Sequence, residues 1–523
     1  MDGEGFELMR LGDAIAEVPL RSPLGMAAAD TEVTGVQHDS RRVESGDLFV
    51  AWRGDVHDGR HFAPDAVARG AAAVLAFGPP PAPAPVPWLE VDDPRASMGS
   101  VAARLYGHPE RELLTVGVTG TNGKSTTAQL IGACLTRSGR SAAVVGTLGR
   151  TVHLPGSVPS AFEPLSQAAE DRTTPESSDL FRMLRRAVDL GARSAAIEVS
   201  SHALDQGRMN GMSFDAAVFT NLTRDHLDYH PSFEAYFAAK RRLFSLLRPG
   251  GAAVLNMDDE HGRRLARLIG SGGSVVRFSA CGRVEADVRV IAAELDLAGI
   301  RAEIETPAGR VTLNSPLLGR FNLENLAAAV AAAQALGVPE EAIRDAVADQ
   351  APLSGRLEPV DRGQEFPVLV DYAHTDGGLR AALGAARELS DRRLAVVFGC
   401  GGDRDRGKRE LMGRAAGELA DLAIVTDDNP RTEEPGLIHA AIVVGLEAAR
   451  GCAWEVVGDR RQAIRRAISV AAAEPGWTVL IAGKGHEATQ TFRDTTVPFR
   501  DRDEAEAALD AMNRERGGET APC

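Results

Sequence analysis

Short runs of consecutive apolar residues recur along this chain, and each leads through a glycine-rich or polar turn into a helix-like pattern. From residue 113 the runs are LLTVGV, SAAVVGTL, ARSAAIEVSS, AAVFTNL and AAVLNMDD. From residue 368 they are VLVDYA, LAVVFGC, LAIVTDD and WTVLIAG. Continuous apolar runs are typical of strands buried on both faces, and their alternation with helices indicates parallel sheets. The pattern predicts an α/β protein with two successive parallel sheets.

Two segments depart from this pattern. Residues 286–313 alternate apolar and polar positions around Gly299 and Gly309, which indicates antiparallel strands at a sheet edge or in a small subsheet. The first hundred residues contain shorter runs, then a proline-rich stretch from Pro79 to Pro87 that suits neither a helix interior nor an inner strand. We therefore expect three domains, comprising a small α/β domain followed by two larger ones: 1–110, 111–352 and 353–523.

Composition narrows the class of protein. The 523 residues are 44% hydrophobic and 25% charged, which is typical of a globular chain too long for one core. The net charge of -15 opposes broad attraction to nucleic acid or anionic membranes. The five cysteines show neither a disulfide framework nor zinc spacing, and no apolar run reaches the ~18 residues of a membrane span. We expect a cytoplasmic monomer whose partners are small molecules, not nucleic acid or a membrane.

A glycine loop follows the strand LLTVGV directly and leads into a helix-like segment. In this order, Gly120 and Gly123 let the backbone approach phosphate oxygens, and the helix N-terminus adds partial positive charge. The spacing G-x-x-G-K-S is shorter than the general Walker form, so the loop is a variant. The alternative, a glycine-rich turn with a surface lysine, does not account for the strand and helix around it. We expect seven residues to bind ATP: Gly120, Thr121, Asn122, Gly123, Lys124, Ser125 and Thr126.

Candidate magnesium ligands lie at the ends of the next strands. Glu198 ends one strand, and Asp225 and His226 lie just beyond another. Ligands of open α/β sheets collect at these carboxyl ends, and hard cations prefer oxygen donors such as the hydroxyl of Ser125. Each residue alone is more often structural than catalytic, but their common placement favours a functional role.

The segment YFAAKRRLF predicts a helix with one apolar and one basic face. Its apolar face is marked by Tyr236, Phe237, Leu243 and Phe244, and its basic face by Arg241 and Arg242. From spacing alone, Lys240 is predicted to be a solvent-exposed residue of this helix.

Nine segments in this order resemble those of the Mur ligase family over nearly the whole chain: TGTNGKST, EVSSH, NLTRDHLDYH, GRFNLENLAAA, SGRLE, VDYAHT, FGCGGDRD, TDDNPRTEEP and AGKGHE. HDSRRVESGDLFVA and DNPR resemble the branch of the family that adds the third amino acid of the cell-wall peptide. The resemblance implies an N-terminal domain for a uridine nucleotide, a central P-loop ATPase-like domain whose parallel sheet is flanked by helices, and a C-terminal Rossmann-like domain. It also implies ATP-dependent ligation of meso-2,6-diaminopimelate to UDP-N-acetylmuramoyl-L-alanyl-D-glutamate through an acyl phosphate, in peptidoglycan precursor synthesis.

The resemblance implies roles for further residues. Those implied to hold the uridine nucleotide and the muramoyl dipeptide are His38, Ser40, Asp55, Val56, His57, Arg172, Thr173, Thr174, Ser200, Gln206 and Arg208. Those implied to join the ATP site are Asn322, Asn325 and Arg356, although the two asparagines alone also fit a capped helix start.

The catalytic residues implied by the resemblance are Lys124, Glu198, His226 and Lys240, with Ser125 completing a magnesium site. The resemblance further implies that Lys240 is carbamoylated to N6-carboxylysine. This modification suits magnesium chemically, because a carbamate offers anionic oxygens whereas an ammonium would repel the cation.

The amino-acid pocket implied by the resemblance consists of Arg404, Asp428, Asn429, Pro430, Arg431, Gly483 and Glu487. An arginine pairs bidentately with a carboxylate, and meso-diaminopimelate carries a distal carboxylate that L-lysine lacks. This favours the diaminopimelate-adding form. The lysine-adding form, a folate polyglutamating ligase and a nucleotide-binding protein without catalysis stay open as alternatives. The chain departs from the family pattern at Asp376, where proline is usual, and at Arg172, where some relatives carry asparagine.

Overall fold

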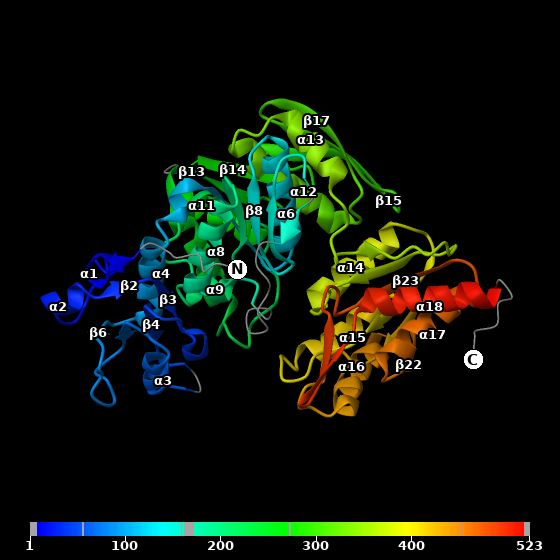
Figure 1. Ribbon diagram of the computed structural model, residues 1–523. Helices are drawn as coiled ribbons and strands as arrows, with labels where there is room; N and C mark the ends of the chain where they lie inside the picture. Colours follow the sequence, from blue (N-terminus) through cyan, green and yellow to red (C-terminus); the bar gives the residue numbers. More distant parts are fainter. Residues whose placement is uncertain are drawn as a thin grey trace.

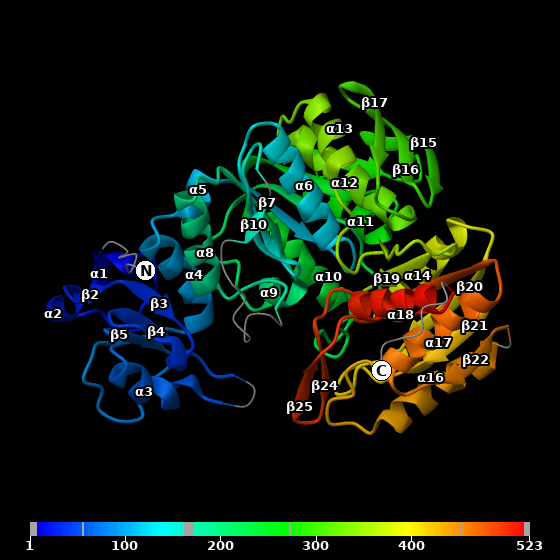
Figure 2. The ribbon, with the colours of Figure 1, turned by 45° about the vertical axis from the view of Figure 1, so that its right-hand side comes forward.

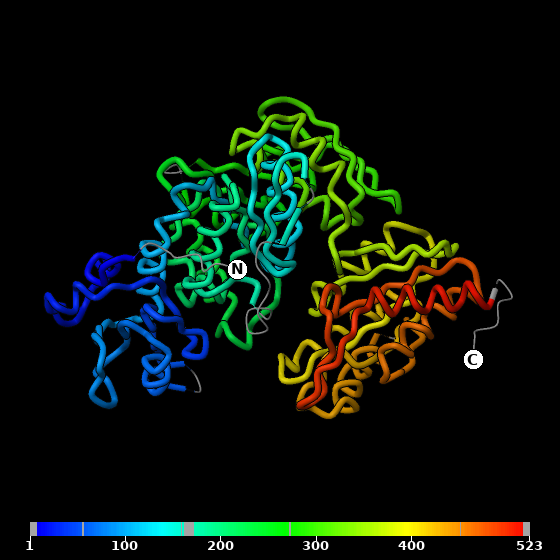
Figure 3. Tube along the Cα trace, viewed as in Figure 1, coloured from blue at the N-terminus to red at the C-terminus, as the bar shows by residue number. Residues whose placement is uncertain are grey.

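The computed structural model describes residues 8–54, 57–157, 159–161, 172–270, 274–449 and 451–516. Three large sheets, of four, 11 and six strands, follow one another along the chain and form three lobes (Figures 1 and 2). The Cα trace passes through these lobes in sequence order, from the blue N-terminal lobe to the orange and red C-terminal lobe (Figure 3). The predicted α/β fold class is confirmed.

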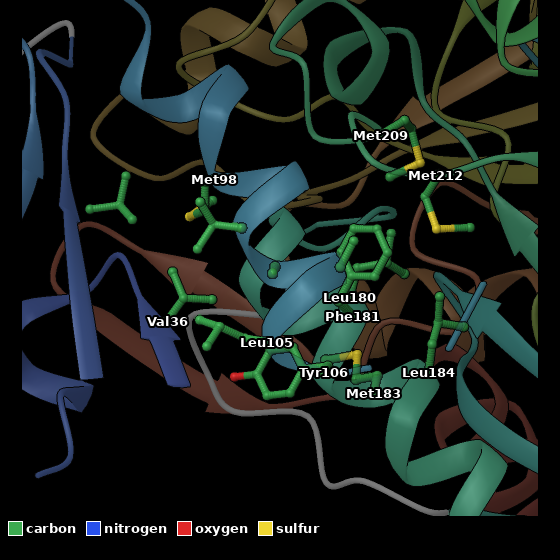
Figure 4. Packing of buried hydrophobic residues seen from close by; sticks show 14 of the residues in the cluster. Val36, Met98, Leu105, Tyr106, Leu180, Phe181, Met183, Leu184, Met209 and Met212 are labelled. Carbon is green, nitrogen blue, oxygen red and sulfur yellow. The ribbon is translucent and has the colours of Figure 1, made fainter. Parts of the chain in front are cut away.

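The N-terminal lobe holds a parallel sheet in the order β3-β4-β5-β6. Its helix α4 packs against α8 of the central lobe, and one apolar cluster runs through both helices (Figure 4). Val36 and Met98 belong to the N-terminal side of this cluster, and Phe181 and Met212 to the central side. The two lobes therefore share a core. The elements are β1 (Met9–Arg10), α1 (Leu11–Ala14), α2 (Met26–Ala29), β2 (Glu32–Val33), β3 (Gly35–Gln37), β4 (Asp47–Ala51), α3 (Ala63–Ala68), β5 (Ala73–Ala76), β6 (Trp88–Glu90), α4 (Pro94–Leu105) and α5 (Pro109–Glu112).

The central sheet has the order β10-β9-β8-β11-β7-β12-β13-β14-β15-β16-β17, and its strands from β8 to β15 run parallel. Helices α6, α12 and α13 cover one face, and α8, α10 and α11 cover the other. Elements up to α10 are β7 (Leu114–Thr119), α6 (Lys124–Arg137), β8 (Ala142–Gly146), β9 (Gly149–His153), β10 (Ser160–Ala161), α8 (Ser177–Asp189), β11 (Ser194–Glu198), α9 (Ser201–Asp205), β12 (Phe214–Phe219) and α10 (Phe233–Arg241). The remainder are β13 (Leu247–Asn256), α11 (Glu260–Ile269), β14 (Ser274–Ser279), β15 (Val288–Asp296), β16 (Gly299–Thr306), β17 (Gly309–Ser315), α12 (Arg320–Ala335) and α13 (Glu340–Asp349).

Strand register at the middle of this sheet sets the position of the phosphate loop. Glu198 pairs with Val118, and Phe219 pairs with Thr119, so β11, β7 and β12 end at the same level. The loop after β7 therefore lies beside the residues that follow its two neighbours. At the far edge, β15, β16 and β17 pair antiparallel, which confirms the prediction for residues 286–313.

The C-terminal lobe has the strand order β18-β19-β23-β20-β21-β22, parallel except for β18. Helices α14, α15 and α16 pack on one face, and α17 and α18 on the other. The elements are β18 (Glu358–Pro359), β19 (Val368–Asp371), α14 (Asp376–Glu388), β20 (Arg393–Phe398), α15 (Lys408–Leu419), β21 (Leu422–Val425), α16 (Pro435–Ala449), β22 (Ala453–Val456), α17 (Arg460–Ala473), β23 (Trp477–Ala482), β24 (Thr489–Phe492), β25 (Thr495–Pro498) and α18 (Asp501–Arg516).

Candidate active site

The phosphate loop connects the end of β7 to the first residue of α6, Lys124. Gly123 precedes the helix with a φ of 85°, a conformation that favours glycine. A Cβ atom on Gly123 would lie 2.2 Å from Oδ1 of Asn325, so α12 docks directly against the loop. Glycine at this position therefore lets α12 and the loop approach each other more closely than a residue with a side chain would allow.

Two lysines converge on this loop from different helices. Nζ of Lys124 donates to the carbonyl oxygens of Gly120 and Thr121 at 3.0 and 2.9 Å. Nζ of Lys240 donates to the same Gly120 oxygen at 2.7 Å. Burial, and then the charge of Lys124, place the pKa of Lys240 well below its usual value. The site therefore favours a neutral amine at Lys240.

The prediction that Lys240 is solvent-exposed is wrong, because its side chain is only 1% accessible. Residues 236, 237, 240, 243 and 244 follow the helical spacing of one face, so its position belongs to the buried stripe. The positive charge of the side chain suggested exposure to solvent, whereas its position on the helix indicates burial. Arg241 and Arg242 are exposed, as expected.

Glu198 is buried at the end of β11, and both of its oxygens are engaged. Oγ of Ser125 donates to Oε2 at 3.0 Å, while the amide of Thr147 donates to Oε1 at 2.9 Å. Burial raises the pKa of Glu198, and Lys124 and Arg356 oppose that rise. Thr147 was not singled out from the sequence, although it directly follows β8 at the same edge of the sheet.

His226 adopts a φ of 53°, a strained conformation for a residue with a side chain. Burial lowers its pKa to about 4, against the opposing charge of Asp225, whose Oδ2 lies 3.4 Å from Nε2. The imidazole is therefore neutral near pH 7, the form in which histidine binds metals. Its ring meets that of Tyr236 edge-on, with centroids 6.1 Å apart.

The predicted magnesium ligands are only partly assembled. Ser125 and Glu198 are hydrogen-bonded, whereas Lys240 is directed at the loop carbonyl. Among the described residues no three histidine, cysteine, aspartate or glutamate side chains form a metal-binding group. The hydroxyl and carboxylate oxygens suit magnesium, and a carbamate on Lys240 would supply the anionic oxygens that the plain amine lacks.

The remaining predicted ATP residues surround the same loop. Asn322 and Asn325 lie inside α12, whose N-cap is Gly319, so the alternative of asparagine caps does not hold. Nδ2 of Asn325 donates to Oδ1 of Asn322 at 3.0 Å. Nη2 of Arg356, which precedes the C-terminal sheet, lies 3.4 Å from Oγ of Ser125 and links the two lobes.

Of the residues predicted to hold the uridine nucleotide, His38 lies where the N-terminal lobe meets α8. Nδ1 of His38 lies 3.0 Å from Oγ of Ser178, and its ring stacks on Trp52 at a centroid distance of 5.7 Å. Ser40 is buried nearby in the chain, while His57 is exposed. The other two predicted residues of that segment lie outside the described residues: Asp55 and Val56.

The residues predicted to hold the dipeptide form one connected network. Oγ1 of Thr174 donates to the carbonyl of Glu198 at 2.9 Å and accepts from the amide of Ser200 at 3.0 Å. Nη1 of Arg208 donates to the carbonyl of Thr174 at 2.9 Å. The network continues through two side-chain contacts, from Arg208 to Gln206 and from Thr147 to Thr173.

Glu176 is the centre of an arginine cluster that the sequence did not reveal. Its Oε1 accepts from Arg172 at 2.7 Å and lies 3.1 Å from Nε of Arg208, while its Oε2 accepts from Nε of Arg95 in the N-terminal lobe at 3.2 Å. Three cations therefore surround one buried carboxylate. Only the nearness of Glu176 to the threonine pair could have pointed to it.

The residues of the predicted amino-acid pocket follow the carboxyl ends of the parallel strands β20, β21 and β23. A Cβ atom on Gly401 would lie 3.0 Å from Nη1 of Arg431 and 3.9 Å from Cγ of Arg404, so the two arginines flank the same backbone. Nδ2 of Asn429 donates to Oε2 of Glu487 at 2.9 Å. The remaining three predicted residues adjoin these: Asp428, Pro430 and Gly483.

The fold and the site define a three-domain α/β protein with a phosphate loop at the carboxyl edge of its central sheet. Residues 32–106 match the catalytic domain of the Mur ligase family, residues 118–333 the Mur ligase middle domain, and residues 355–485 the Mur ligase glutamate ligase domain. The chain belongs to the Mur ligase family.

Individual relatives agree with this assignment. Proteins of Solibacter usitatus and Streptomyces coelicolor, each named UDP-N-acetylmuramoyl-L-alanyl-D-glutamate--2,6-diaminopimelate ligase, are both 43% identical to this chain. The alignments cover 96% and 92% of this chain and 98% and 94% of the relatives. A solved structure of a ligase with the same name is 34% identical, with a TM-score of 0.66 over 97% of this chain and 100% of its own.

A more distant structure tests the folate alternative. The folylpolyglutamate synthase of Mycobacterium tuberculosis is 20% identical, with a TM-score of 0.61 over 81% of this chain and 95% of its own. That likeness shows the fold alone, whereas the similarity to the diaminopimelate ligases extends through the sequence. Within the described residues, no helix is long and apolar enough to span a membrane.

Proposed function

We propose that this protein ligates meso-2,6-diaminopimelate to UDP-N-acetylmuramoyl-L-alanyl-D-glutamate, using ATP, in the synthesis of peptidoglycan precursors. The observation that carries the proposal is the similarity to ligases of that name along nearly the whole chain. The phosphate loop and the arginine pair at Arg404 and Arg431 supply groups that such a reaction needs. We place the reaction in the cytoplasm, where ATP is available. The monomeric state stays a prediction.

The reaction has two steps. An oxygen of the dipeptide carboxylate attacks the γ-phosphorus of ATP and releases ADP, giving an acyl phosphate. The amine of diaminopimelate then attacks the acyl carbon, the C–N bond forms, a proton leaves the nitrogen and phosphate departs. Lys124 and the loop amides hold the phosphates and offset the repulsion between the nucleotide and the carboxylate.

A magnesium ion would add charge neutralisation between nucleotide and carboxylate, held by Ser125, Glu198, His226 and carbamoylated Lys240. Two features support the modification. The amine of Lys240 is buried next to the charge of Lys124, which favours its neutral and nucleophilic form. Addition of carbon dioxide to the neutral amine, with release of a proton, places an anion beside Lys124, which the charge of Lys124 attracts.

The residues of the predicted pocket carry charges of both signs. Arg404 and Arg431 offer guanidinium groups for the distal carboxylate of diaminopimelate, while Glu487 offers a carboxylate for an ammonium group. L-lysine would leave the arginines without an anionic partner. Arg431 is half-buried and Arg404 is exposed, so the preference for diaminopimelate should come from ion pairs with its distal carboxylate that L-lysine cannot form.

The test is phosphate release by the purified protein with ATP, magnesium and the UDP-linked dipeptide, with either meso-diaminopimelate or L-lysine as acceptor. We expect turnover with diaminopimelate and a tripeptide product of the matching mass. Turnover with lysine alone would support the ligase activity but contradict the assignment of the pocket to diaminopimelate. Silence with both acceptors would contradict the proposed function and favour a nucleotide-binding protein without catalysis.

A further inference from the structure

Lys484 is a buried cation that the ligation mechanism does not use. It lies between β23 and β24 in the segment AGKGHE, and its side chain is 0% exposed. Nζ donates to Oε2 of Glu487 at 2.9 Å and to Oδ1 of Asn429 at 3.2 Å. A lysine ammonium has three donors and no acceptor, and burying it without partners is costly. The buried ammonium group therefore depends on these two side chains as hydrogen-bond acceptors.

The bonds to Lys484 restrict Glu487 and Asn429 to one arrangement. Oδ1 of Asn429 also accepts from the amide of Thr491 at 3.0 Å, and Nδ2 donates to Oε2 of Glu487. Oε2 thus accepts two bonds. Within the described part of the chain Oε1 accepts none, and the side chain of Glu487 is 31% exposed. Oε1 is therefore the oxygen that is free to meet a ligand.

Lys484 also acts electrostatically on a second carboxylate, that of Asp428. Burial by itself would raise the pKa of Asp428, but Lys484 and then Arg460 hold it below its usual value. Arg460 is already paired with Asp501 through two bonds of 2.7 and 2.8 Å. Without Lys484, Asp428 and Glu487 would lose the cation that they share.

The backbone around Lys484 is held independently of its ammonium group. A Cβ atom on Gly485 would lie 2.7 Å from Cβ of Tyr372, and one on Gly355 would lie 2.3 Å from the amide nitrogen of His486. The loop is thus packed tightly against the segments that contain Gly355 and Tyr372. Loss of the ammonium group should therefore let the side chain of Glu487 change its conformation, while the backbone of the loop keeps its own.

We propose that Lys484 is a positioning residue for the amino-acid substrate: it orients Glu487 so that Oε1 faces the ammonium group of the incoming diaminopimelate. Lys484 acts through Glu487 and Asn429 and does not touch the substrate. The inference rests on the proposed function, because it assumes that this pocket takes an amino acid.

The test is a double-mutant cycle on the full-length enzyme with Lys484→Met, Glu487→Gln and both changes together. Lys484→Met should raise the KM for diaminopimelate by roughly 10- to 100-fold, the range expected for losing a hydrogen bond to a charged group. The KM values for ATP and for the UDP-linked dipeptide should stay close to those of the wild type. On the Glu487→Gln background the same change should cost less than about threefold, because the residue it orients is already altered.

Arg461→Met is the matched control, since it removes a cation of the same lobe that pairs with Glu504 on the surface. Its three KM values should not change. Equal losses from Lys484→Met on both backgrounds would overturn the proposal, and so would a parallel rise in all three KM values with a lower Tm. If the wild type accepts lysine and not diaminopimelate, the function proposal fails separately, and the same cycle with lysine still decides the role of Lys484.

Discussion

At the scale of the residue, the site depends on charged side chains brought close together inside the protein. Lys124 and Lys240 donate to one carbonyl oxygen, although 116 positions separate them in the chain numbering. The charge of Lys124 adds to burial in lowering the pKa of Lys240 well below its usual value. The chemical state of Lys240 is therefore the first feature of the site to test.

Lys240→Ala should lower kcat by roughly 100- to 1,000-fold, because it removes the anionic group proposed to hold magnesium at the site. Small carboxylates such as acetate or formate should restore part of the rate. Phosphate release is the measurement. Arg241→Ala, an exposed neighbour on the same helix, is the control and should be near wild type. Unimpaired turnover of Lys240→Ala would rule out the carbamate.

Arg431→Ala should raise the KM for diaminopimelate by roughly 100-fold, because the distal carboxylate loses its guanidinium partner. The preference for diaminopimelate over L-lysine should narrow by a similar factor, measured as the ratio of kcat/KM values. The control is Arg493→Ala. Arg493 donates its backbone amide to the carbonyl of Arg431, but its side chain is 75% exposed. An unchanged preference in Arg431→Ala would contradict the pocket assignment.

At the scale of the element, the residues proposed to bind ATP come from α6 with its preceding loop and from α12. The phosphate loop enters α6 at Lys124, and α12 brings Asn325 to within contact of Gly123. The sequence predicted both helices from their composition and from the glycine loop. Their mutual docking was not predictable, because no local pattern records which helix packs on which loop.

Gly123→Ala should abolish ATP binding, because its Cβ would enter the space held by Asn325. Gly139→Ala is the matched control. Gly139 follows α6 with a φ of 89°, close to the 85° of Gly123, but a Cβ atom there meets nothing within 4 Å. Both changes should cost about 1–2 kcal/mol in the free energy of unfolding through backbone strain. Fluorescent nucleotide titration separates them: retained binding in Gly123→Ala would contradict the docking argument.

At the scale of the whole molecule, the three lobes are not equally independent. The N-terminal lobe shares one apolar cluster with α8 and the central sheet, and Arg42 forms two hydrogen bonds with Asp179 across the same boundary. The C-terminal lobe has two clusters on opposite faces of its sheet, and of their buried residues only Leu318 comes from the central lobe. Its contacts with the central lobe include the 3.7 Å ion pair between Arg224 and Asp405.

The two terminal lobes should therefore behave differently when produced alone. A fragment of residues 353–523 should fold cooperatively, because both faces of its sheet are covered by its own helices. A fragment of residues 1–110 should not, because it lacks α8 and would expose apolar residues of α4 such as Met98. Circular dichroism during thermal unfolding is the measurement. A cooperative transition in the short fragment would show that the shared core is dispensable.

The sequence by itself determined the strands, the phosphate loop and the motif residues, because these depend on local order. Apolar runs, glycine positions and short motifs indicate the same local structure whatever the tertiary fold. It also allowed the antiparallel edge of residues 286–313 to be predicted from alternation alone.

Only the tertiary structure decided which charged groups meet. Three contacts join residues from different segments of the chain: Lys240 with Gly120, Glu176 with Arg95, and Lys484 with Asn429. The number of residues between two positions does not give the distance between them in the fold. A charged side chain on an apolar helix face is therefore predicted to be exposed unless its partners are known. The fold supplies those partners, and with them the electrostatic environment on which the chemistry depends.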